Sequence, residues 1–323
     1  MSTETKTKIQ TRPLTPKFGV EVIGVDLSKP FDEETAKSIH DLWIQYGLLL
    51  FRDPTADDEA QMRLSRLFGE MEPAATADMN DPNNQFMMTL KYDPTDTKPS
   101  FQQNWHFGGE DRAGYIPWHW DQSFMPTIVR GAVLRMEQPA SRLGQTGFID
   151  AIDAYDRLSP ELQKRIEGLE VVYHFVGDFS ECRAGTPADL RKLPRDRPAS
   201  GTKYEFPPVV HPMVITQQET GRKALKISPL QVQYVLGMDR AESDALIAEL
   251  CAVLCDESHA YFHEWQKNDM VVWDNWRMIH SARGVPLDVP RSARRTTIVG
   301  DYAVGRYLDP ELDRNRPVKR IVD

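Results

Sequence analysis

The spacing of apolar side chains along the chain predicts many short β-strands and a few helices. Residues 19–25 alternate apolar and polar positions with the period of two of a half-buried strand, and residues 48–51 form a wholly apolar run of strand length. Residues 32–46 instead place apolar side chains along one face of a helix that begins at Asp32, a favourable N-cap residue. By the same criteria we expect further helices at residues 56–68, 152–157, 160–168 and 241–255, and further strands at residues 131–136, 169–175, 212–216, 270–273 and 296–301.

Two stretches without clear periodicity interrupt this pattern. Residues 70–118 and 177–208 are rich in turn formers, which is typical of lids and binding loops. We expect them to be irregular, lid-like insertions in a single domain over residues 13–323, after a flexible polar leader at residues 1–12. Strands do not alternate with helices, and neither a G-x-G-x-x-G nor a G-x-x-x-x-G-K-[ST] motif occurs. The pattern therefore favours a mainly β fold with flanking helices, of the barrel or jelly-roll kind.

Composition narrows the functional classes. The 323 residues include 48 acidic and 39 basic side chains, and the formal net charge of −9 disfavours binding to nucleic acid. No apolar run reaches the ~18 residues that span a bilayer, and the polar segment at residues 1–10 does not resemble a secretory signal. Three cysteines, Cys182, Cys251 and Cys255, cannot all be paired, and a reducing compartment accounts for them. We expect a cytoplasmic protein that binds neither nucleic acid nor membranes.

Candidate metal ligands occur in residues 117–121, whose sequence is Pro-Trp-His-Trp-Asp. Side chains two residues apart on a strand point to the same side, so His119 and Asp121 can bind one metal ion. His280, which follows another apolar strand, is the best candidate for a third ligand. Two histidines and one carboxylate on one face of an octahedron leave three positions open, the arrangement of non-heme Fe(II) oxygenases. By itself the H-x-D triplet is a weak signal, because such triplets also arise by chance.

Three arginines are clustered at residues 291–295, after His280 in this acidic chain: Arg291, Arg294 and Arg295. An arginine that enters an apolar strand needs an anionic partner, and a guanidinium group can bind a carboxylate through two hydrogen bonds. The candidate metal ligands and the arginines together are therefore consistent with a site that binds iron and a dicarboxylate co-substrate. For Arg294 we favour a solvent-exposed face of the strand.

Several motifs, in the same order, resemble the taurine dioxygenase / 2,4-dichlorophenoxyacetate dioxygenase family of Fe(II)- and 2-oxoglutarate-dependent oxygenases. The matching segments span nearly the whole chain: residues 14–27, residues 47–53, a W-H-x-D-x-[ST]-F box at residues 118–124, an H-P…E-T-G-R-K-x-L segment at residues 211–225, and residues 273–280 with the arginine cluster. The resemblance implies a cupin-like double-stranded β-helix, or jelly roll. It also implies a dioxygenase that couples oxidation of a substrate C–H bond, with hydroxylation favoured, to conversion of 2-oxoglutarate and O2 into succinate and CO2.

The resemblance implies roles for individual residues. Thr146 and Arg291 correspond to the residues that bind the distal carboxylate of 2-oxoglutarate, and Arg295 corresponds to an arginine that can contact the anion of an acidic substrate. The family sequence G-G-D-T is Leu-Gly-Gln-Thr here, at residues 143–146. Related halogenases lack the metal-binding carboxylate, so its presence favours oxygen insertion or desaturation. The iron ligands of the family correspond to His119, Asp121 and His280.

The substrate is expected to be a small, partly apolar molecule with a carboxylate. His106 in the expected lid and the aromatic residues Trp120 and Phe124 are candidate substrate contacts; a solvent-facing histidine and core aromatics are the alternatives. Lys91 and Tyr92 lie near the place where taurine-specific members have their sulfonate-binding pattern, which argues against taurine.

Several alternatives stay open. The chain can be a non-catalytic cupin-like binding or sensor protein, a taurine or alkylsulfonate dioxygenase, or a hydrolase that holds zinc in the same triad. Self-association into a homo-oligomer is common in the family that the chain resembles, and the sequence leaves this point open. Cys251, Cys255 and His259 recur every four residues, but their apolar neighbours favour a buried helix face over a second metal site. We expect His263 to be structural or exposed.

Overall fold

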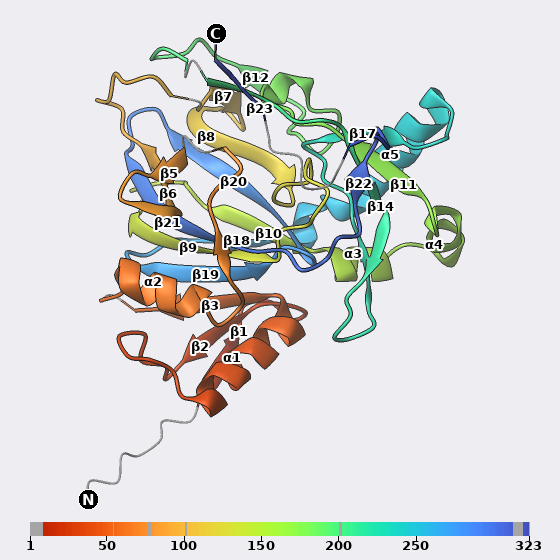
Figure 1. The fold of residues 1–323 in the computed structure, drawn as a ribbon. Helices are drawn as coiled ribbons and strands as arrows, with labels where there is room; N and C mark the ends of the chain where they lie inside the picture. The colour runs from red at the N-terminus through yellow and green to blue at the C-terminus, as the bar shows by residue number, and fades with distance from the viewer. Residues whose placement is uncertain are drawn as a thin grey trace, which may run out of the picture.

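The computed structural model describes residues 9–53, 55–76, 79–100, 102–199, 202–312 and 319–322. Within these ranges the largest sheet has nine strands, and only the pair β2–β3 in it is parallel (Figure 1). Strand β4 (Met71–Glu72) pairs with β21, and the other strands follow the order β1 (Gln10–Pro13), β2 (Val20–Ile23), β3 (Leu48–Arg52), β19 (Asp269–Asp274), β9 (Gly131–Gln138), β21 (Arg291–Ile298), β6 (Asn84–Tyr92) and β5 (Asn80–Asp81).

A second, antiparallel sheet faces the first. Its order is β12 (Arg191–Lys192), β7 (Asn104–Phe107), β8 (Glu110–His119), β20 (Met278–Pro286), β10 (Thr146–Asp150) and β18 (Tyr261–His263). Phe148 of β10 and Trp273 of β19 have ring centroids 5.8 Å apart, and both belong to one buried apolar cluster. Two facing sheets of this kind form a jelly roll, which confirms the fold class predicted from the sequence.

Smaller sheets lie beside the jelly roll, and the four-stranded one extends it at one side (Figure 1). One has the order β17 (Val232–Val235), β11 (Glu170–Tyr173), β14 (Val209–Pro212) and β22 (Arg306–Tyr307). Two further pairs are β13 (Thr202–Glu205) with β23 (Lys319–Val322) and β15 (Val214–Thr216) with β16 (Lys223–Leu225).

The helices lie outside the sheets. They are α1 (Glu33–Tyr46), α2 (Asp58–Ser65), α3 (Ala151–Asp156), α4 (Pro160–Ile166) and α5 (Arg240–Leu254), with short 3₁₀ turns η2 (Phe179–Glu181) and η3 (Glu257–His259). The carboxylate of Asp32 accepts a hydrogen bond from the Thr35 N–H, which confirms the predicted start of α1. None of the helices in the described part of the chain combines the length and apolar character needed to cross a lipid bilayer.

The first four residues of β3, 48–51, are all apolar because both faces of this part of the strand are covered. Leu49 and Phe51 pack in a cluster with residues of α1 and α2, whereas Leu48 and Leu50 pack in the cluster between the two sheets. Because successive side chains of a strand point to opposite faces, a strand covered on both faces must be apolar at every position.

The structure corrects two expectations about irregular segments. Residues 70–118 are not mainly an irregular insertion, because they contribute strands β4 to β8, and β6 and β8 lie inside the two main sheets. Residues 10–12 of the expected leader pair with β2, while residues 1–8 lie outside the described part of the chain. In contrast, the described residues of the range 177–208 form only η2, β12 and β13, as their composition suggests.

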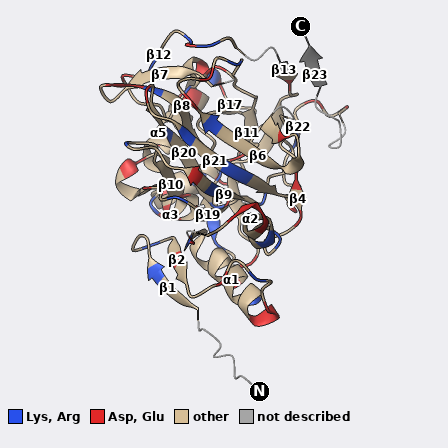
Figure 2. Cartoon of the chain, turned by 90° about the vertical axis from the view of Figure 1, so that its left-hand side faces the viewer, with Lys and Arg blue, Asp and Glu red and all other residues tan. Residues whose placement is uncertain are grey.

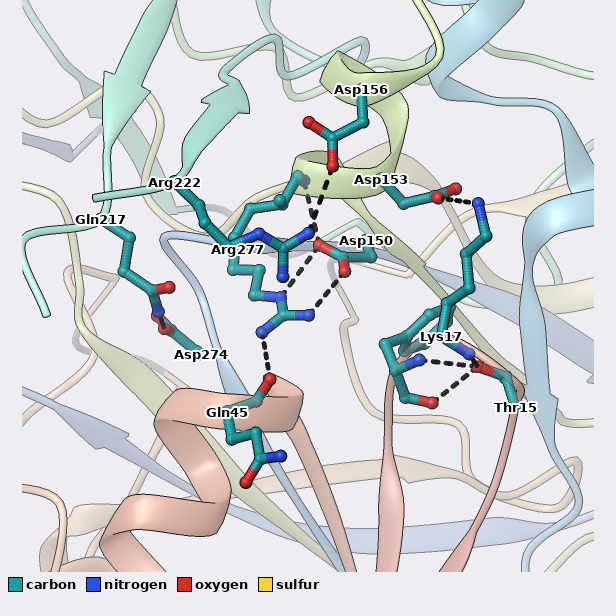
Figure 3. Close-up of polar contacts among 12 residues, drawn as sticks. Thr15, Lys17, Gln45, Asp150, Asp153, Asp156, Gln217, Arg222, Asp274 and Arg277 are labelled. Atoms are coloured by element: carbon teal, nitrogen blue, oxygen red, sulfur yellow. Dashed lines mark hydrogen bonds and ion pairs between the residues drawn. The ribbon is translucent and has the colours of Figure 1, made fainter. Parts of the chain in front are cut away.

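A buried ion pair ties the helices to the strand that carries His280. Arg277, directly before β20, donates two hydrogen bonds to the carboxylate of Asp150, at 3.0 and 2.7 Å (Figure 3). Its remaining nitrogen donates to the backbone carbonyls of Ile44 and Gln45 at the C-terminal end of α1. Asp150 also accepts the N–H of Ile152 and so caps α3. The two side chains are each 2% exposed, so a single contact joins α1, α3 and β20.

We expect the change Asp150→Ala to lower the free energy of unfolding by about 3–5 kcal/mol, because it leaves the Arg277 guanidinium buried without its carboxylate. Urea unfolding measures this difference. The matched control is Asp41→Ala, which removes an ion pair between the exposed side chains of Lys37 and Asp41 and should change stability by less than about 0.5 kcal/mol. Equal effects of the two changes would contradict the assignment.

Candidate metal centre

Two histidines and one aspartate meet between strands β8 and β20. His119 at the end of β8 lies opposite His280 of β20, and Asp121 follows two residues after His119. Oδ1 of Asp121 is 3.8 Å from Nε2 of His119 and 3.6 Å from Nε2 of His280. One donor atom from each of the three residues lies within 4.8 Å of the others, and the side chains are between 6% and 12% exposed. This spacing suits three ligands of one metal ion, and the structure thus brings together the three residues predicted from the sequence.

Hydrogen bonds fix the orientation of two of these ligands. Nδ1–H of His119 donates to the carbonyl of Pro117 at 2.8 Å, which leaves Nε2 free toward Asp121. The backbone N–H of Asp121 donates to Oδ1 of Asn275 at 2.7 Å, and the Asn275 amide donates to the carbonyls of Asp121 and Val129. The sequence reasoning assigned no role to Asn275; the structure shows that it holds the turn after β8.

The protonation states also suit metal binding. Burial lowers the pKa of both His119 and His280, which favours the neutral imidazoles that bind metal ions. Burial alone would raise the pKa of Asp121, but Arg295 and the two imidazoles outweigh burial and hold that pKa at about 2. All three side chains are therefore in their metal-binding forms at neutral pH.

Arg295 is an ion-pair partner of the candidate metal ligand. Its Nη2 lies 2.7 Å from Oδ2 of Asp121, the carboxylate oxygen on the far side from the imidazoles. Its guanidinium also stacks over the ring of Trp273, 5.4 Å from the centroid. The positive charge of Arg295 is thus balanced within the protein.

A first cavity of about 150 Å³ lies beside the triad, between the two main sheets. Its wall includes His119, His280, Thr146 and Arg291. Burial lowers the pKa of Arg291 to about 10, and no carboxylate among the described residues counteracts this shift. An arginine with an unbalanced charge in a small cavity is a binding site for an anion.

Thr146 completes the polar side of this cavity. Its hydroxyl oxygen accepts a hydrogen bond from Nε1 of Trp265 at 3.0 Å, so the hydroxyl proton remains free to be donated to a ligand. The turn before it keeps a left-handed backbone: φ is +59° at Leu143 and +79° at Gly144. A side chain at Gly144 would meet Ala140 at 3.0 Å and Arg291 at 3.7 Å, so this position needs glycine. Although residues 143–146 differ from the family sequence G-G-D-T, Thr146 still lines the same cavity as Arg291.

A second cavity, of about 580 Å³, borders the triad at His119 and Asp121 and shares part of its wall, including His119 and Arg295, with the first. Its walls are mainly apolar, and Phe124 contributes to them, as predicted. The ring of Phe124 packs edge-on against Phe175 and Phe206, with centroids 4.9 and 4.4 Å away. This cavity has the size and the apolar walls of a site for a small organic molecule.

Two candidate contacts predicted from the sequence do not lie on either cavity wall. Trp120 is fully buried on the other side of the strand end, where its ring contacts His211 and the ammonium of Lys226. His106 lies in β7 and pairs with Asp111 at 2.5 Å. Trp120 points away because it lies between His119 and Asp121, and alternate side chains face opposite sides.

The expectation for Arg294 is wrong. Its side chain is only 12% exposed and forms ion pairs with Asp58 of α2 and Asp81 of β5. Strand β21 lies between β6 and β9, and basic residues interrupt it at several positions (Figure 2). Arg291 and Arg295 share one face of this strand, toward the cavities, whereas Arg294 points to the opposite face and α2.

The other sequence candidates for metal binding are structural. Cys251 and Cys255 are free thiols whose pKa burial raises, and His259 lies beside Asp153 and Asp256. Among the described residues, the triad is the group of side chains close enough to hold a metal ion. His263 is fully buried and is held by Asp269 and Tyr261, which makes it a structural residue.

The chain is similar to known proteins over most of its length. Residues 10–297 match the model of the family described as taurine catabolism dioxygenase TauD, TfdA family. The (S)-phenoxypropionate/alpha-ketoglutarate-dioxygenase of Sphingobium herbicidovorans is 30% identical over 302 residues, which cover 90% of this chain and 95% of that protein. The alpha-ketoglutarate-dependent 2,4-dichlorophenoxyacetate dioxygenase of Cupriavidus pinatubonensis is 27% identical over 306 residues, with 92% and 99% coverage.

A solved structure shares the fold. The crystal structure of a putative alpha-ketoglutarate-dependent taurine dioxygenase from Burkholderia xenovorans superimposes with a TM-score of 0.71 at 21% identity. The match covers 97% of this chain and 98% of that one, so the architecture is shared over nearly its whole length.

We expect the change His280→Ala to weaken Fe(II) binding by about 100-fold or more, because it removes one of three ligands. Anaerobic equilibrium dialysis with Fe(II) measures the affinity. His106→Ala is the matched control, since it removes an imidazole outside both cavities and should leave the affinity unchanged. Unaltered Fe(II) binding by a folded His280→Ala protein would contradict the assignment of the triad.

Proposed function

The chain belongs to the TauD, TfdA family of dioxygenases, and we propose that it uses Fe(II), 2-oxoglutarate and O2 to oxidise a C–H bond of a small, partly apolar, carboxylate-bearing molecule. Hydroxylation is the favoured outcome. The observation that carries this proposal is the unbalanced charge of Arg291 in a small cavity that touches both histidines of the triad. A metal triad beside a single anion site fits a metal ion and a carboxylate co-substrate, here 2-oxoglutarate, the alpha-ketoglutarate of the relatives' names.

The donor set fits a ferrous ion. Two neutral imidazoles and one ionised carboxylate on one side of an ion leave the other coordination positions open. His119, Asp121 and His280 would hold the ion, with His119 oriented by Pro117. Arg295 would keep Asp121 ionised and turned so that Oδ1 faces the imidazoles.

The first cavity fits the distal carboxylate of 2-oxoglutarate. Arg291 would donate two hydrogen bonds to this group, and Thr146 would add its free hydroxyl proton. When bound, the ferrous ion and 2-oxoglutarate together supply the oxidising power drawn from O2, with succinate and CO2 as co-products. The protein itself contributes binding, orientation and an apolar surrounding that keeps water out.

The second cavity is the proposed substrate site. It is lined mainly by apolar side chains, among them Phe124, and it reaches the triad at His119 and Asp121. Arg295, the substrate contact that the family resemblance suggests, lies on the same wall, but Asp121 already balances its charge. The aryloxy acids named for two relatives are molecules of this class. Taurine, which is small and polar, suits a mainly apolar cavity of about 580 Å³ less well.

The proposal is tested by succinate release with a panel of aryloxyalkanoic acids, terpenoid acids and sulfonates, assayed with Fe(II), ascorbate and 2-oxoglutarate. A dioxygenase releases succinate in proportion to the substrate oxidised. A hydrolase would act with zinc and without 2-oxoglutarate, and a binding or sensor protein would bind ligands without releasing succinate. We further propose a cytoplasmic protein, which agrees with the three free thiols of the chain.

We expect the change Arg291→Gln to raise the 2-oxoglutarate concentration needed for half-maximal binding by about 10–100-fold, because a carboxylate loses its charged donor. Anaerobic titration of the Fe(II)-loaded protein with 2-oxoglutarate measures this shift. Fe(II) affinity should not change.

The matched control is Arg294→Gln on the same strand. Arg294 pairs with Asp58 and Asp81 on the opposite face, so its loss should leave 2-oxoglutarate binding unchanged. Equal 2-oxoglutarate affinities for the Arg291 variant and the unaltered protein would refute the assigned anion site.

A further inference from the structure

Each of the two cavities contains one arginine whose charge is not balanced by a carboxylate among the described residues. In the first cavity this residue is Arg291, and in the second it is Arg195. Arg295 lines both cavities, but Asp121 already balances its charge at 2.7 Å. The second cavity thus has an anion site of its own, separate from the arginine beside the metal centre.

Arg195 is held in a defined orientation. It lies between β12 and β13, and its Nη1 donates hydrogen bonds to the carbonyls of Ser100 and Gln102 at 2.9 and 2.8 Å. Carbonyl groups fix a guanidinium group without cancelling its charge. The neighbouring carboxylate, Asp196, is used elsewhere: it accepts a hydrogen bond from Tyr92 and lies 3.5 Å from Arg197. The other N–H groups of Arg195 remain available to the cavity.

The walls around Arg195 define the rest of the ligand. Phe124, Phe175, Phe179, Met79 and Met88 line the same cavity. The surroundings are therefore apolar, and in such surroundings an ion pair is stronger than in water. A ligand that fits has an aromatic or alicyclic body and one anionic group.

We propose that Arg195 binds the anionic group of the substrate and makes the second cavity selective for organic anions with an apolar body. This inference rests on the proposed function, because it assigns a specificity-determining residue to the same substrate site. Arg295 then serves first to orient Asp121, while Arg195, from the segment at residues 177–208, recognises the charge of the substrate. This segment, which lines part of the cavity, would thereby also determine which molecules bind there.

The test is equilibrium dialysis under anaerobic conditions, with protein loaded with Fe(II), in the presence and absence of 2-oxoglutarate. The probes are 2-phenoxypropionate and cyclohexanecarboxylate, each compared with its neutral amide, and phenyl sulfate as a second kind of anion. We expect the unaltered protein to bind at least one anion about 10–100-fold more tightly than the corresponding neutral probe. Arg195→Gln should lose this preference, whereas 2-oxoglutarate affinity should stay the same.

Two further variants separate recognition of charge from a merely structural role. Arg195→Lys keeps the charge and should retain part of the preference for the anion. Arg191→Gln removes an exposed arginine of β12 outside the cavity wall and should retain all of it.

The inference is overturned if the unaltered protein shows no preference for anions, if Arg195→Gln keeps the preference, or if the Gln and Lys variants lose it equally. Loss of the preference in Arg295→Gln with full retention in Arg195→Gln would assign the anion to Arg295 instead. Failure of the unaltered protein to bind 2-oxoglutarate would refute the proposed function. The preference for anions is also measured without 2-oxoglutarate, so that measurement tests the role of Arg195 independently of the proposed function.

Discussion

The register between β8 and β20 is the constraint on which the metal centre depends. His119 lies opposite His280, but a bulge follows at once, where Pro117 and Trp118 together oppose the single residue Ser281. Proline has no N–H to donate to a neighbouring strand, so it is tolerated at such a bulge. Its carbonyl, left free by the bulge, accepts the hydrogen bond that orients His119. A slip of one residue in this pairing would turn His119 to the other face and separate the two imidazoles.

Successive side chains of β21 point to opposite faces of the sheet, so its arginines contact two different parts of the protein. Arg291 and Arg295 point toward the cavities, and Arg294 points toward α2, where it meets Asp58. Helix α2 is fastened to the same strand by hydrogen bonds from the Gln61 amide to the Arg294 carbonyl and between Ser65 and Thr296. One strand therefore anchors the outer helix through one face and supplies charge to the binding cavities through the other. The contacts between α2 and β21 thereby help to fix the positions of Arg291 and Arg295 on the opposite face of the strand.

Sequence reasoning succeeded where local pattern determines structure. His119 and Asp121 share a side because they are two residues apart at a strand end, and this rule holds in any strand. It failed at residues 70–118 because Gly114, with φ of +70°, and Pro117 interrupt the pattern of β8 without ending the strand. Arg195 gave no local signal at all, since its surroundings are created by backbone carbonyls and aromatic residues that lie far away in the sequence.

Two kinds of cationic side chain can be distinguished in this fold by the groups that they contact. Arg277 is balanced by a carboxylate, and Lys226, whose pKa burial lowers to about 7, donates its hydrogens to the carbonyls of Asn275 and Trp276 outside both cavities. Such groups are satisfied within the protein and hold elements together. Arg291 and Arg195 instead face cavities with their charge unbalanced. A cationic side chain that faces a cavity without a carboxylate partner can bind an anionic ligand, and both proposed anion sites rest on this property.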